Sequence, residues 1–349
     1  MRRGVKIVLA VVGGLIAALV LLLAGLTLLG FGHLSIRTPV AQRAEFDCAS
    51  CGTYPGRLVA DGHDLVRGDG SAVRLRGVMV PALERLSDQG RLRPELFRTI
   101  AAAGANVVRL PVDPETWRSD PEYVARFLDP AVRWAGDAGL YAIVDLHMIG
   151  NVETGAGQAM PASPALPLAE GFWSAVSAYF RAAPNTLFEV FNEPAGITAD
   201  AWQPVAADLV RTIRAGGAQQ LVIVGGVDFA SDASWVADSP IADDNVAYAV
   251  HVYPGTSVDW GRSFGAIAAR YPVLVTEWGF MDENPSPSQG YLNGSQATYG
   301  DRLMAFLNER GIGWVACWWD TEWEPPMLSR DGTSYTRLGQ FVVQQLRNR

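Results

Sequence analysis

From about residue 73 to the C-terminus, short apolar runs alternate with longer amphipathic runs, and this rhythm restricts the fold more than any other feature. Continuous apolar strands between helices are typical of a parallel sheet whose outer side is covered. Eight such units within about 280 residues predict a (β/α)8 barrel rather than a doubly wound sheet. The predicted strands are residues 73–80, 106–112, 140–147, 186–194, 220–226, 246–254, 273–280 and 313–320.

The predicted helices fill most of the gaps between these strands. They are residues 94–105, 127–139, 168–184, 200–217, 264–271, 297–311 and 335–348. The unit between the fifth and sixth strands is the weakest, because residues 228–244 show poor helical periodicity. Ahead of the first strand, alternating apolar residues and turn signals at 61–62 and 68–70 predict a short hairpin.

The N-terminus is organised differently from the rest of the chain. An apolar run from Ile7 to Gly32 follows Arg2, Arg3 and Lys6. A run of about 20 apolar residues can span a bilayer, and flanking cations stay on the cytoplasmic side. The sequence therefore predicts a single transmembrane helix, with the chain from Leu34 onward outside the cytoplasm. The alternative is secretion after cleavage of a signal peptide, although the apolar region of such a peptide has only about 7–15 residues.

These features predict four segments: a cytoplasmic basic stub at 1–6, a transmembrane anchor at 7–32, a linker at 33–54 and a (β/α)8 domain at 55–349. The linker contains Cys48 and Cys51, for which a local disulfide is favoured over a zinc site, because two further ligands are not close by. Cys317 lies in an apolar strand and is expected to be a buried free thiol. The formal net charge of −8 disfavours nucleic acid as a partner.

Polar side chains follow at least five of the predicted strands. Because the carboxyl ends of barrel strands carry the active site, these side chains are expected to meet at one face. They are Arg109, Asp145, His147, Asn192, Glu193, His251, Tyr253, Glu277, Trp278, Trp318, Trp319 and Asp320. Each alone is compatible with a structural role. Their convergence on one end of a barrel favours a catalytic site.

Glu193 and Glu277 follow the fourth and seventh strands and would face one another across the barrel mouth. Hydrolysis of an acetal needs such a pair, in which one carboxylic acid protonates the leaving oxygen and one carboxylate attacks or activates water. Glu277 would be kept ionised by Arg109 and by the phenol of Tyr253. Glu193, beside aromatic strand residues, would be the proton donor.

The segments NVVRLPV, VDLH, FNEP, HVY and VTEWG, with a tryptophan on the eighth strand, together resemble glycoside hydrolase family 5, from about Val59 to the C-terminus. The resemblance implies a retaining mechanism with Glu193 as acid/base and Glu277 as nucleophile. It further implies that Asn192 holds the sugar 2-hydroxyl, His147 lines the same subsite, His251 tunes Glu193 and a tryptophan stacks under the sugar.

The sequence also departs from the family pattern at several of these places. Ala195 and Gly196 follow the NEP triplet where the family often has His-Gly, and the first strand ends in Met79 where many relatives have Asn. The stacking tryptophan could be Trp318 or Trp319. Strand alternation places Trp318 on one face with Trp314 and Ala316, and this weakly favours Trp318.

The expected function is hydrolysis of β-linked glucan or a related β-glycan by a monomer that needs no metal or organic cofactor. One alternative keeps the chemistry but changes the substrate to β-mannan, a cell-envelope glycan or a glycolipid. Another alternative is a carbohydrate-binding envelope protein without catalysis. Long loops at 148–167 and 281–296 are expected to wall a cleft. Trp260 and Trp323 are further candidates for sugar contacts.

Overall fold

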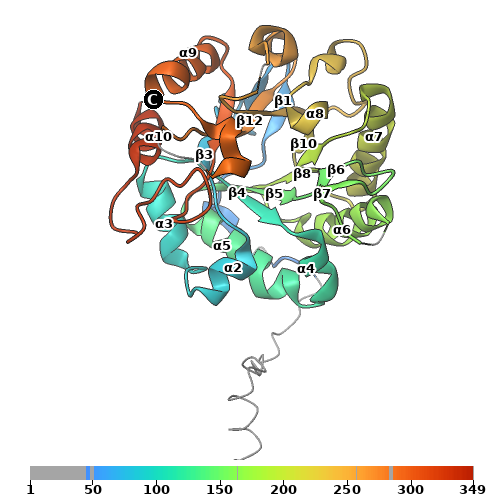
Figure 1. The fold of residues 1–349 in the computed structure, drawn as a ribbon. Helices are drawn as coiled ribbons and strands as arrows, with labels where there is room; N and C mark the ends of the chain where they lie inside the picture. Colours follow the sequence, from blue (N-terminus) through green and yellow to red (C-terminus); the bar gives the residue numbers. More distant parts are fainter. Residues whose placement is uncertain (1–44, 48–50, 163, 257, 283–285, 349) are drawn as a thin grey trace, which may run out of the picture. The chain divides into compact units, whose positions relative to one another are not determined.

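A computed structural model describes residues 45–47, 51–162, 164–256, 258–282 and 286–348. Eight parallel strands close into a barrel in which each strand pairs with its neighbours along the chain, as the sequence predicts (Figure 1). In chain order the barrel strands are β3 (Arg76–Met79), β4 (Val107–Val112), β5 (Tyr141–Leu146), β8 (Thr186–Glu189), β10 (Val222–Gly225), β11 (Val246–Val252), β12 (Val273–Trp278) and β13 (Gly313–Ala316).

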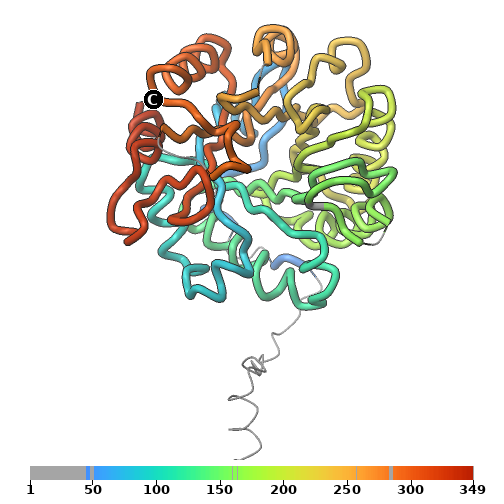
Figure 2. The backbone as a smooth tube through the Cα atoms, viewed as in Figure 1, coloured from blue at the N-terminus to red at the C-terminus, as the bar shows by residue number. Residues whose placement is uncertain are grey.

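Helices surround the barrel (Figures 1 and 2). The α-helices are α2 (Leu83–Asp88), α3 (Pro94–Ala102), α4 (Pro114–Ser119), α5 (Asp129–Asp137), α6 (Ala165–Phe180), α7 (Ala199–Ala215), α8 (Val227–Ala230), α9 (Asp301–Glu309) and α10 (Arg337–Arg347). Segments of π-helix are η2 (Val124–Leu128), η4 (Gly261–Gly265) and η7 (Gln296–Gly300). Segments of 3-10 helix are η1 (Cys51–Thr53), η3 (Ser234–Ala237), η5 (Ile267–Ala269) and η6 (Pro287–Leu292).

The apolar strands are buried on both faces. Side chains such as Ile143 and Leu187 fill the barrel interior, whereas Val108 and Val144 pack between the sheet and the helices. This two-sided burial explains the nearly continuous apolar runs, because successive strand residues point to opposite faces. All six residues of β4 are buried, including Arg109.

Two strands precede the barrel. β1 (Val59–Asp61) and β2 (Asp64–Val66) pair in antiparallel fashion, and Gly62 in the turn between them has a φ of +60° that suits glycine. Leu58 and Leu65 pack into the same apolar cluster as the barrel interior, and Ala60 N–H donates to the side chain of Asn245, just ahead of β11. The hairpin therefore lies at the amino ends of the strands, away from the carboxyl ends.

The predicted anchor and the cytoplasmic stub lie outside the described residues. Among the residues that are described, we find no helix with the length and apolar character needed to cross a bilayer. Cys51 is disulfide-bonded, as a local disulfide requires, although the position of Cys48 is not described. Cys317 is a buried free thiol, as predicted.

Two predicted elements differ in the structure. Residues 264–271, expected as a helix, instead form the end of η4 followed by η5. The N–H of Ala266 donates to the carbonyl of Gly261, five residues back, so the backbone hydrogen bonds here do not follow the α-helical pattern. The predicted strand 186–194 is interrupted: β8 ends at Glu189, and Glu193–Pro194 form a separate strand, β9. The weak unit after β10 contains only the four-residue α8 and η3.

Candidate active site

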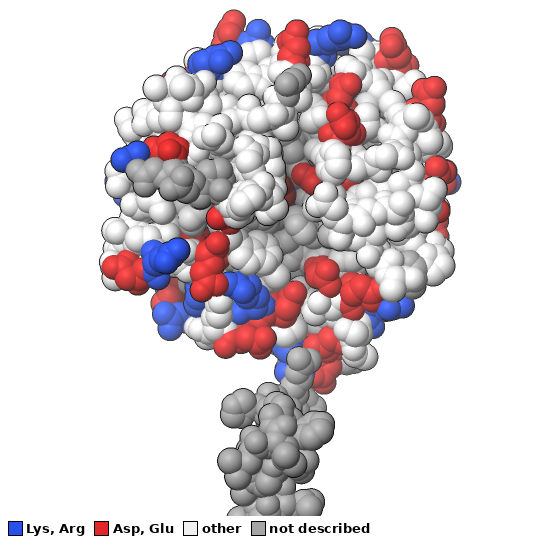
Figure 3. Space-filling view, viewed as in Figure 1, with Lys and Arg blue, Asp and Glu red and all other residues white. Residues whose placement is uncertain are grey.

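A cleft of about 950 Å³ opens at the carboxyl ends of the barrel strands. It is visible as a hollow near the middle of the face shown in Figure 3, bordered largely by uncharged side chains. Of the twelve residues expected at the strand ends, seven line it: His147, Asn192, Glu193, His251, Tyr253, Glu277 and Trp318. Arg109 is completely buried and donates hydrogen bonds to two of these residues, Asn192 and Glu277.

The long loop after β5 holds Glu193 in place. It forms β6 (Ile149–Gly150) and β7 (Gly157–Ala159), and β6 pairs in parallel with β9 (Glu193–Pro194). The backbone N–H of Glu193 donates to the carbonyl of Met148 at 3.0 Å. This loop, which the sequence predicts only as a wall of the cleft, thus fixes the backbone of a candidate catalytic residue.

Arg109 connects the floor of the site. Its guanidinium donates from Nε to Glu189 at 2.5 Å, from Nη1 to Glu277 at 2.6 Å and from Nη2 to the amide oxygen of Asn192 at 2.9 Å. Asp145 lies 3.2 Å from Nη2. Because the Asn192 oxygen faces Arg109, its amide nitrogen points away, and this buried nitrogen has no hydrogen-bond partner within the described part of the chain.

Glu277 is held as a carboxylate. One oxygen accepts from Arg109 and the other accepts from the phenol of Tyr253 at 2.9 Å. Burial by itself would raise the pKa of Glu277, but the positive charges of His251, Arg109 and His147 and the Tyr253 hydrogen bond outweigh it and lower the pKa to about 2. Burial raises the pKa of Tyr253 well above its ordinary value, so the phenol remains a donor.

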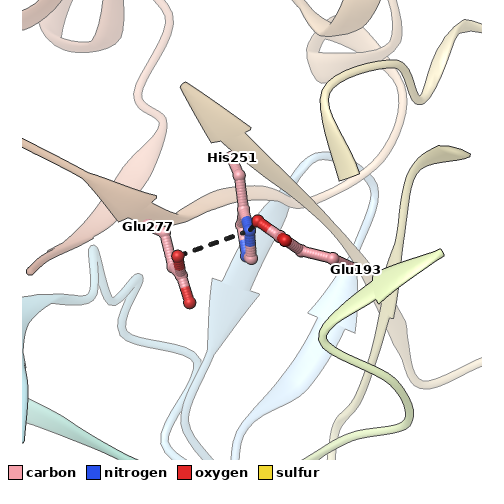
Figure 4. A group of neighbouring side chains, drawn as sticks. All are labelled: Glu193, His251 and Glu277. Atoms are coloured by element: carbon pink, nitrogen blue, oxygen red, sulfur yellow. Dashed lines mark hydrogen bonds and ion pairs between the residues drawn. The ribbon is translucent and has the colours of Figure 1, made fainter. Parts of the chain in front are cut away.

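His251 lies between the two glutamates (Figure 4). Its Nδ1 is 2.8 Å from Glu193 and 3.6 Å from Glu277. A register shift between Val250 and His251 in β11 places the ring at this position, in agreement with the tendency of bulges to re-aim side chains near active sites. Burial would lower the pKa of His251, but the neighbouring Glu277 and Glu193 carboxylates raise it above its ordinary value.

The carboxylates of Glu193 and Glu277 are close together. One oxygen of each, together with a ring nitrogen of His251, lies in a group whose atoms are all within 4.8 Å of one another. Retaining glycosidases place their two carboxyl groups about 5–5.5 Å apart, whereas inverting enzymes need about 6.5–9.5 Å to admit a water. The observed spacing fits direct attack by one carboxylate.

The same three groups could offer ligand atoms to a metal ion. Each is already engaged within the protein: Glu277 with Arg109 and Tyr253, His251 with Thr276, and Glu193 with His251. The buried positive charge of Arg109 next to Glu277 would also repel a cation. The donor set therefore fits acid/base chemistry better than metal binding.

Aromatic rings form one wall of the cleft. Trp318 contacts His147, with ring centroids 6.3 Å apart, and Trp323 at 4.7 Å. Trp319 turns away and packs against Tyr335 in the outer core. Trp318 is thus the cleft residue, but the alternation argument for it was wrong: β13 ends at Ala316, and Trp314 packs in the helix-covered layer while Trp318 belongs to the interior cluster.

His147 is oriented by Asp145, whose carboxylate lies 2.7 Å from His147 Nδ1. Burial would lower the pKa of His147, but the negative charge and hydrogen bond of Asp145 raise it. The remaining strand-end residues have structural contacts. Trp278 packs against Trp314 and Phe341. Buried Asp320 pairs with Arg91 and accepts from the backbone of Trp323.

Sequence reasoning missed Glu189, Thr276 and Phe229. Glu189 and Thr276 are fully buried polar residues beneath the cleft, and a charged residue inside an apolar strand was the available signal. Phe229 lines the cleft and is 45% exposed. It belongs to α8, in which Asp228, Phe229 and Ala230 all have φ between +54° and +58°, and such strained backbone concentrates at functional sites.

The other tryptophan candidates differ in position. Trp323 lines the cleft, whereas Trp260 lines a neighbouring pocket of about 550 Å³ and packs between Tyr299 and Phe306.

Comparisons with known proteins agree with this geometry. A family model described as Cellulase (glycosyl hydrolase family 5) matches residues 66–323, which is 258 of the 349 residues. The chain is 28% identical over 272 residues to Endoglucanase N of Pectobacterium atrosepticum, covering 74% of this chain and 56% of that protein. It is 26% identical over 306 residues to Endoglucanase A of Butyrivibrio fibrisolvens, covering 84% and 66%. The chain thus spans between about half and two thirds of the length of these relatives.

Among solved structures, a beta-glucanase of Saccharophagus degradans in complex with cellotetraose matches with a TM-score of 0.82 at 25% identity, covering 90% of this chain and 99% of that chain. The catalytic domain of a Thermobifida fusca endoglucanase matches with a TM-score of 0.70 at 22% identity, covering 84% and 98%, and shares the fold. With a family model that matches most of the barrel and paired glutamates at the ends of its fourth and seventh strands, this chain belongs to glycoside hydrolase family 5.

Proposed function

We propose that the protein is a retaining endo-β-glucanase that cleaves a neutral β-glucan. The observation that carries this proposal is the pair of close carboxylates in unlike surroundings. Glu277 is surrounded by positive charge and a phenol donor, and its pKa is about 2. Glu193 lies beside the imidazole of His251 instead. A nucleophile must be ionised and an acid must hold a proton, so this difference assigns the two roles.

On this proposal the reaction has two steps. Glu277 attacks the anomeric carbon while Glu193 gives its proton to the departing glycosidic oxygen, and a glycosyl ester of Glu277 forms. Glu193, now a carboxylate, then removes a proton from water as the water attacks the same carbon and releases Glu277. Two inversions leave the anomeric configuration unchanged.

The neighbouring residues would bind the sugar. Arg109 orients the amide of Asn192, whose nitrogen has no partner among the described residues and would donate to the sugar 2-hydroxyl. Trp318 offers a ring for stacking and His147 lines the same part of the cleft. Uncharged and aromatic side chains suit a neutral polysaccharide. The relatives are named endoglucanases, and the similar Saccharophagus structure holds cellotetraose.

A polysaccharide panel with the detergent-solubilised full chain tests this proposal. We expect reducing ends from mixed-linkage β-glucan or carboxymethylcellulose, a fall in viscosity that precedes most of the reducing-end release, and a first product with retained configuration by NMR. Hydrolysis confined to β-mannan, or to an envelope glycan or glycolipid, would replace the substrate assignment. An inverted first product would refute the two-step mechanism.

The roles of the glutamates are tested separately. Glu277→Ala should abolish hydrolysis while the protein keeps its folded circular dichroism spectrum, whereas Glu309→Ala on the exposed side of α9 should retain activity. A 2-deoxy-2-fluoro β-glycoside should label Glu277, as read by peptide mapping. Labelling of another residue would redirect the nucleophile assignment. Binding of glucan without turnover in the wild type would favour a carbohydrate-binding protein.

We further propose that residues 7–32 anchor the protein in a membrane, with a linker at 33–54 and the catalytic domain at 55–349 outside the cytoplasm. The support is the length of the apolar run and the three cations ahead of it. High salt should leave the protein in the membrane fraction, and detergent should release it. Recovery of a shortened chain in the medium would indicate secretion after signal cleavage instead.

A further inference from the structure

Glu189 is a buried carboxylate that the two-step reaction does not use. It is the last residue of β8, is 0% exposed and lies beneath the cleft floor rather than on it. Its two oxygens have different partners: Oε2 accepts from Arg109 Nε at 2.5 Å, and Oε1 accepts from the hydroxyl of Thr276 at 2.8 Å. Burying a charge without a function is costly, so these contacts need an explanation.

The Thr276 hydroxyl connects Glu189 to His251. His251 Nε2 lies 3.1 Å from Thr276 Oγ1. A hydroxyl has one hydrogen, and an ionised carboxylate can only accept, so the hydrogen of Thr276 is committed to Glu189. The contact with His251 must then run the other way, with Nε2–H donating to Thr276 Oγ1. The Glu189 carboxylate thereby dictates which ring nitrogen of His251 carries a hydrogen.

The hydrogen on Nε2 determines what Nδ1 of neutral His251 can do. With Nε2 protonated, neutral His251 presents a lone pair at Nδ1, which faces Glu193 at 2.8 Å. That lone pair can accept only from a protonated Glu193. The arrangement therefore favours the protonated form of Glu193 that the first step needs. It also lets Nδ1 share this proton without any change at Nε2.

Charged groups surround both Glu189 and His251. Arg109, Asp145 and His251 act on Glu189, and Glu277, Glu193 and Arg109 act on His251. Burial raises the pKa of Glu189, and the guanidinium of Arg109 opposes that rise. Arg109 also pairs with Glu277. Glu189 therefore contacts the cation beside the candidate nucleophile and, through Thr276, the histidine beside the candidate acid.

We propose that Glu189 is a positioning residue which, through the hydroxyl of Thr276, keeps the hydrogen of neutral His251 on Nε2 and directs Nδ1 to Glu193. This inference rests on the proposed function in taking Glu193 as the acid/base. The part of the proposal that concerns which nitrogen of His251 carries the hydrogen does not depend on any activity.

The first test is ¹⁵N NMR of the full chain with labelled histidine. The chain has four histidines, and loss of one signal in His251→Asn assigns His251. As the pH rises, Nε2 should stay protonated and Nδ1 should be the nitrogen that loses its proton. Loss of the proton from Nε2 in the wild type would overturn the proposal, whether or not the protein hydrolyses glucan.

The second test is Glu189→Gln. The new amide must offer its oxygen to Arg109 Nε, so its NH₂ donates to Thr276, whose hydrogen is then released toward His251 Nε2. His251 should now carry its hydrogen on Nδ1 and donate to ionised Glu193. We expect the basic limb of the kcat/KM profile to move down by about one pH unit, the order expected for a charge-assisted hydrogen bond.

Matched variants separate this role from simple stabilisation. Thr276→Val removes the hydroxyl at nearly constant volume and should move the same limb in the same direction, whereas Thr276→Ser keeps the hydroxyl and should keep the wild-type profile. Glu95→Gln on the exposed side of α3 should change neither readout. The proposal is refuted if Glu189→Gln keeps both the wild-type basic limb of the kcat/KM profile and the wild-type protonation of Nε2. A loss of stability alone would lower activity without moving that limb.

Discussion

Replacing Arg109 by methionine should destabilise the fold in a strongly pH-dependent way. The side chain is completely buried, and its guanidinium contacts the carboxylates of Asp145, Glu189 and Glu277. Methionine is unbranched like the stem of arginine and carries no charge, so these three carboxylates would share a buried site without their common cation. Removing one partner of a buried ion pair typically costs about 3–5 kcal/mol.

A second estimate comes from protonation. The variant can relieve repulsion by protonating one carboxylate, and at pH 7 this costs about 3.7 kcal/mol for a glutamate whose unfolded pKa is about 4.3. The same step costs about 1 kcal/mol at pH 5. The two estimates agree at pH 7, where we expect the free energy of unfolding to fall by about 3–5 kcal/mol, and the loss should shrink by about 1.4 kcal/mol per pH unit below that.

The buried carboxylates change stability with pH in opposite directions in the wild type and in Arg109→Met. In the wild type, the pKa of Glu277 is about 2, below its ordinary value, so its contribution to stability is complete above the unfolded pKa and is lost only as the pH falls toward 2. In the variant, the folded pKa of a buried carboxyl rises above the unfolded value, so the carboxyl destabilises at neutral pH and this effect fades on acidification. The difference between the proteins must therefore narrow between pH 7 and pH 5.

Urea unfolding at pH 5, 6 and 7, followed by tryptophan fluorescence, measures this difference. Arg330→Met, at an exposed position, is the matched control and should show no pH-dependent change. An Arg109→Met variant whose destabilisation is equal at pH 5 and pH 7, or is below about 1 kcal/mol at pH 7, would refute the idea that one cation balances three buried carboxylates.

Three further predictions concern the reaction. Glu193→Ala should slow hydrolysis of glycosides with poor leaving groups by about a hundredfold or more, and that of activated aryl glycosides far less in the first step; equal losses would contradict the acid role. Trp318→Ala, measured in a Glu277→Ala background by calorimetry with cellotetraose, should weaken binding about tenfold, and an unchanged Kd would remove Trp318 from the sugar site. The charge of His251 is the largest of those that lower the pKa of Glu277 against the effect of burial, so His251→Ala should move the acid limb of kcat/KM to higher pH. An unmoved limb would show that this charge does not hold the nucleophile ionised.

The barrel could be predicted because its physical signature is local. Each parallel strand covered on both sides must be apolar, and the polar residue that ends such a run marks the open rim. Arg109, Glu193 and Glu277 were therefore predictable as neighbours although they lie far apart in the sequence. The prediction of a helix at residues 264–271 was wrong, because eight residues carry too little periodicity to distinguish an α-helix from the η4 and η5 segments.

The support of Glu193 could not be predicted in the same way. β6 and β9 are two residues each and pair through backbone atoms, so their contact leaves no side-chain pattern in the sequence. Trp318 shows a related limit. Alternation is reliable only while a strand stays regular, and β13 ends two residues before Trp318.

The distribution of charge explains why these residues act together. Asp145, Glu189 and Glu277 bring three carboxylates to the site, and Arg109 alone supplies one permanent positive charge. After the opposing effect of burial, Asp145 and Glu277 raise the pKa of His147, and Glu277 and Glu193 raise the pKa of His251, so the two rings can provide further positive charge. In return, their charges help to lower the pKa of Glu277. The ionised nucleophile is thus a property of the whole cluster, and substitution of any one member should change the protonation of the others.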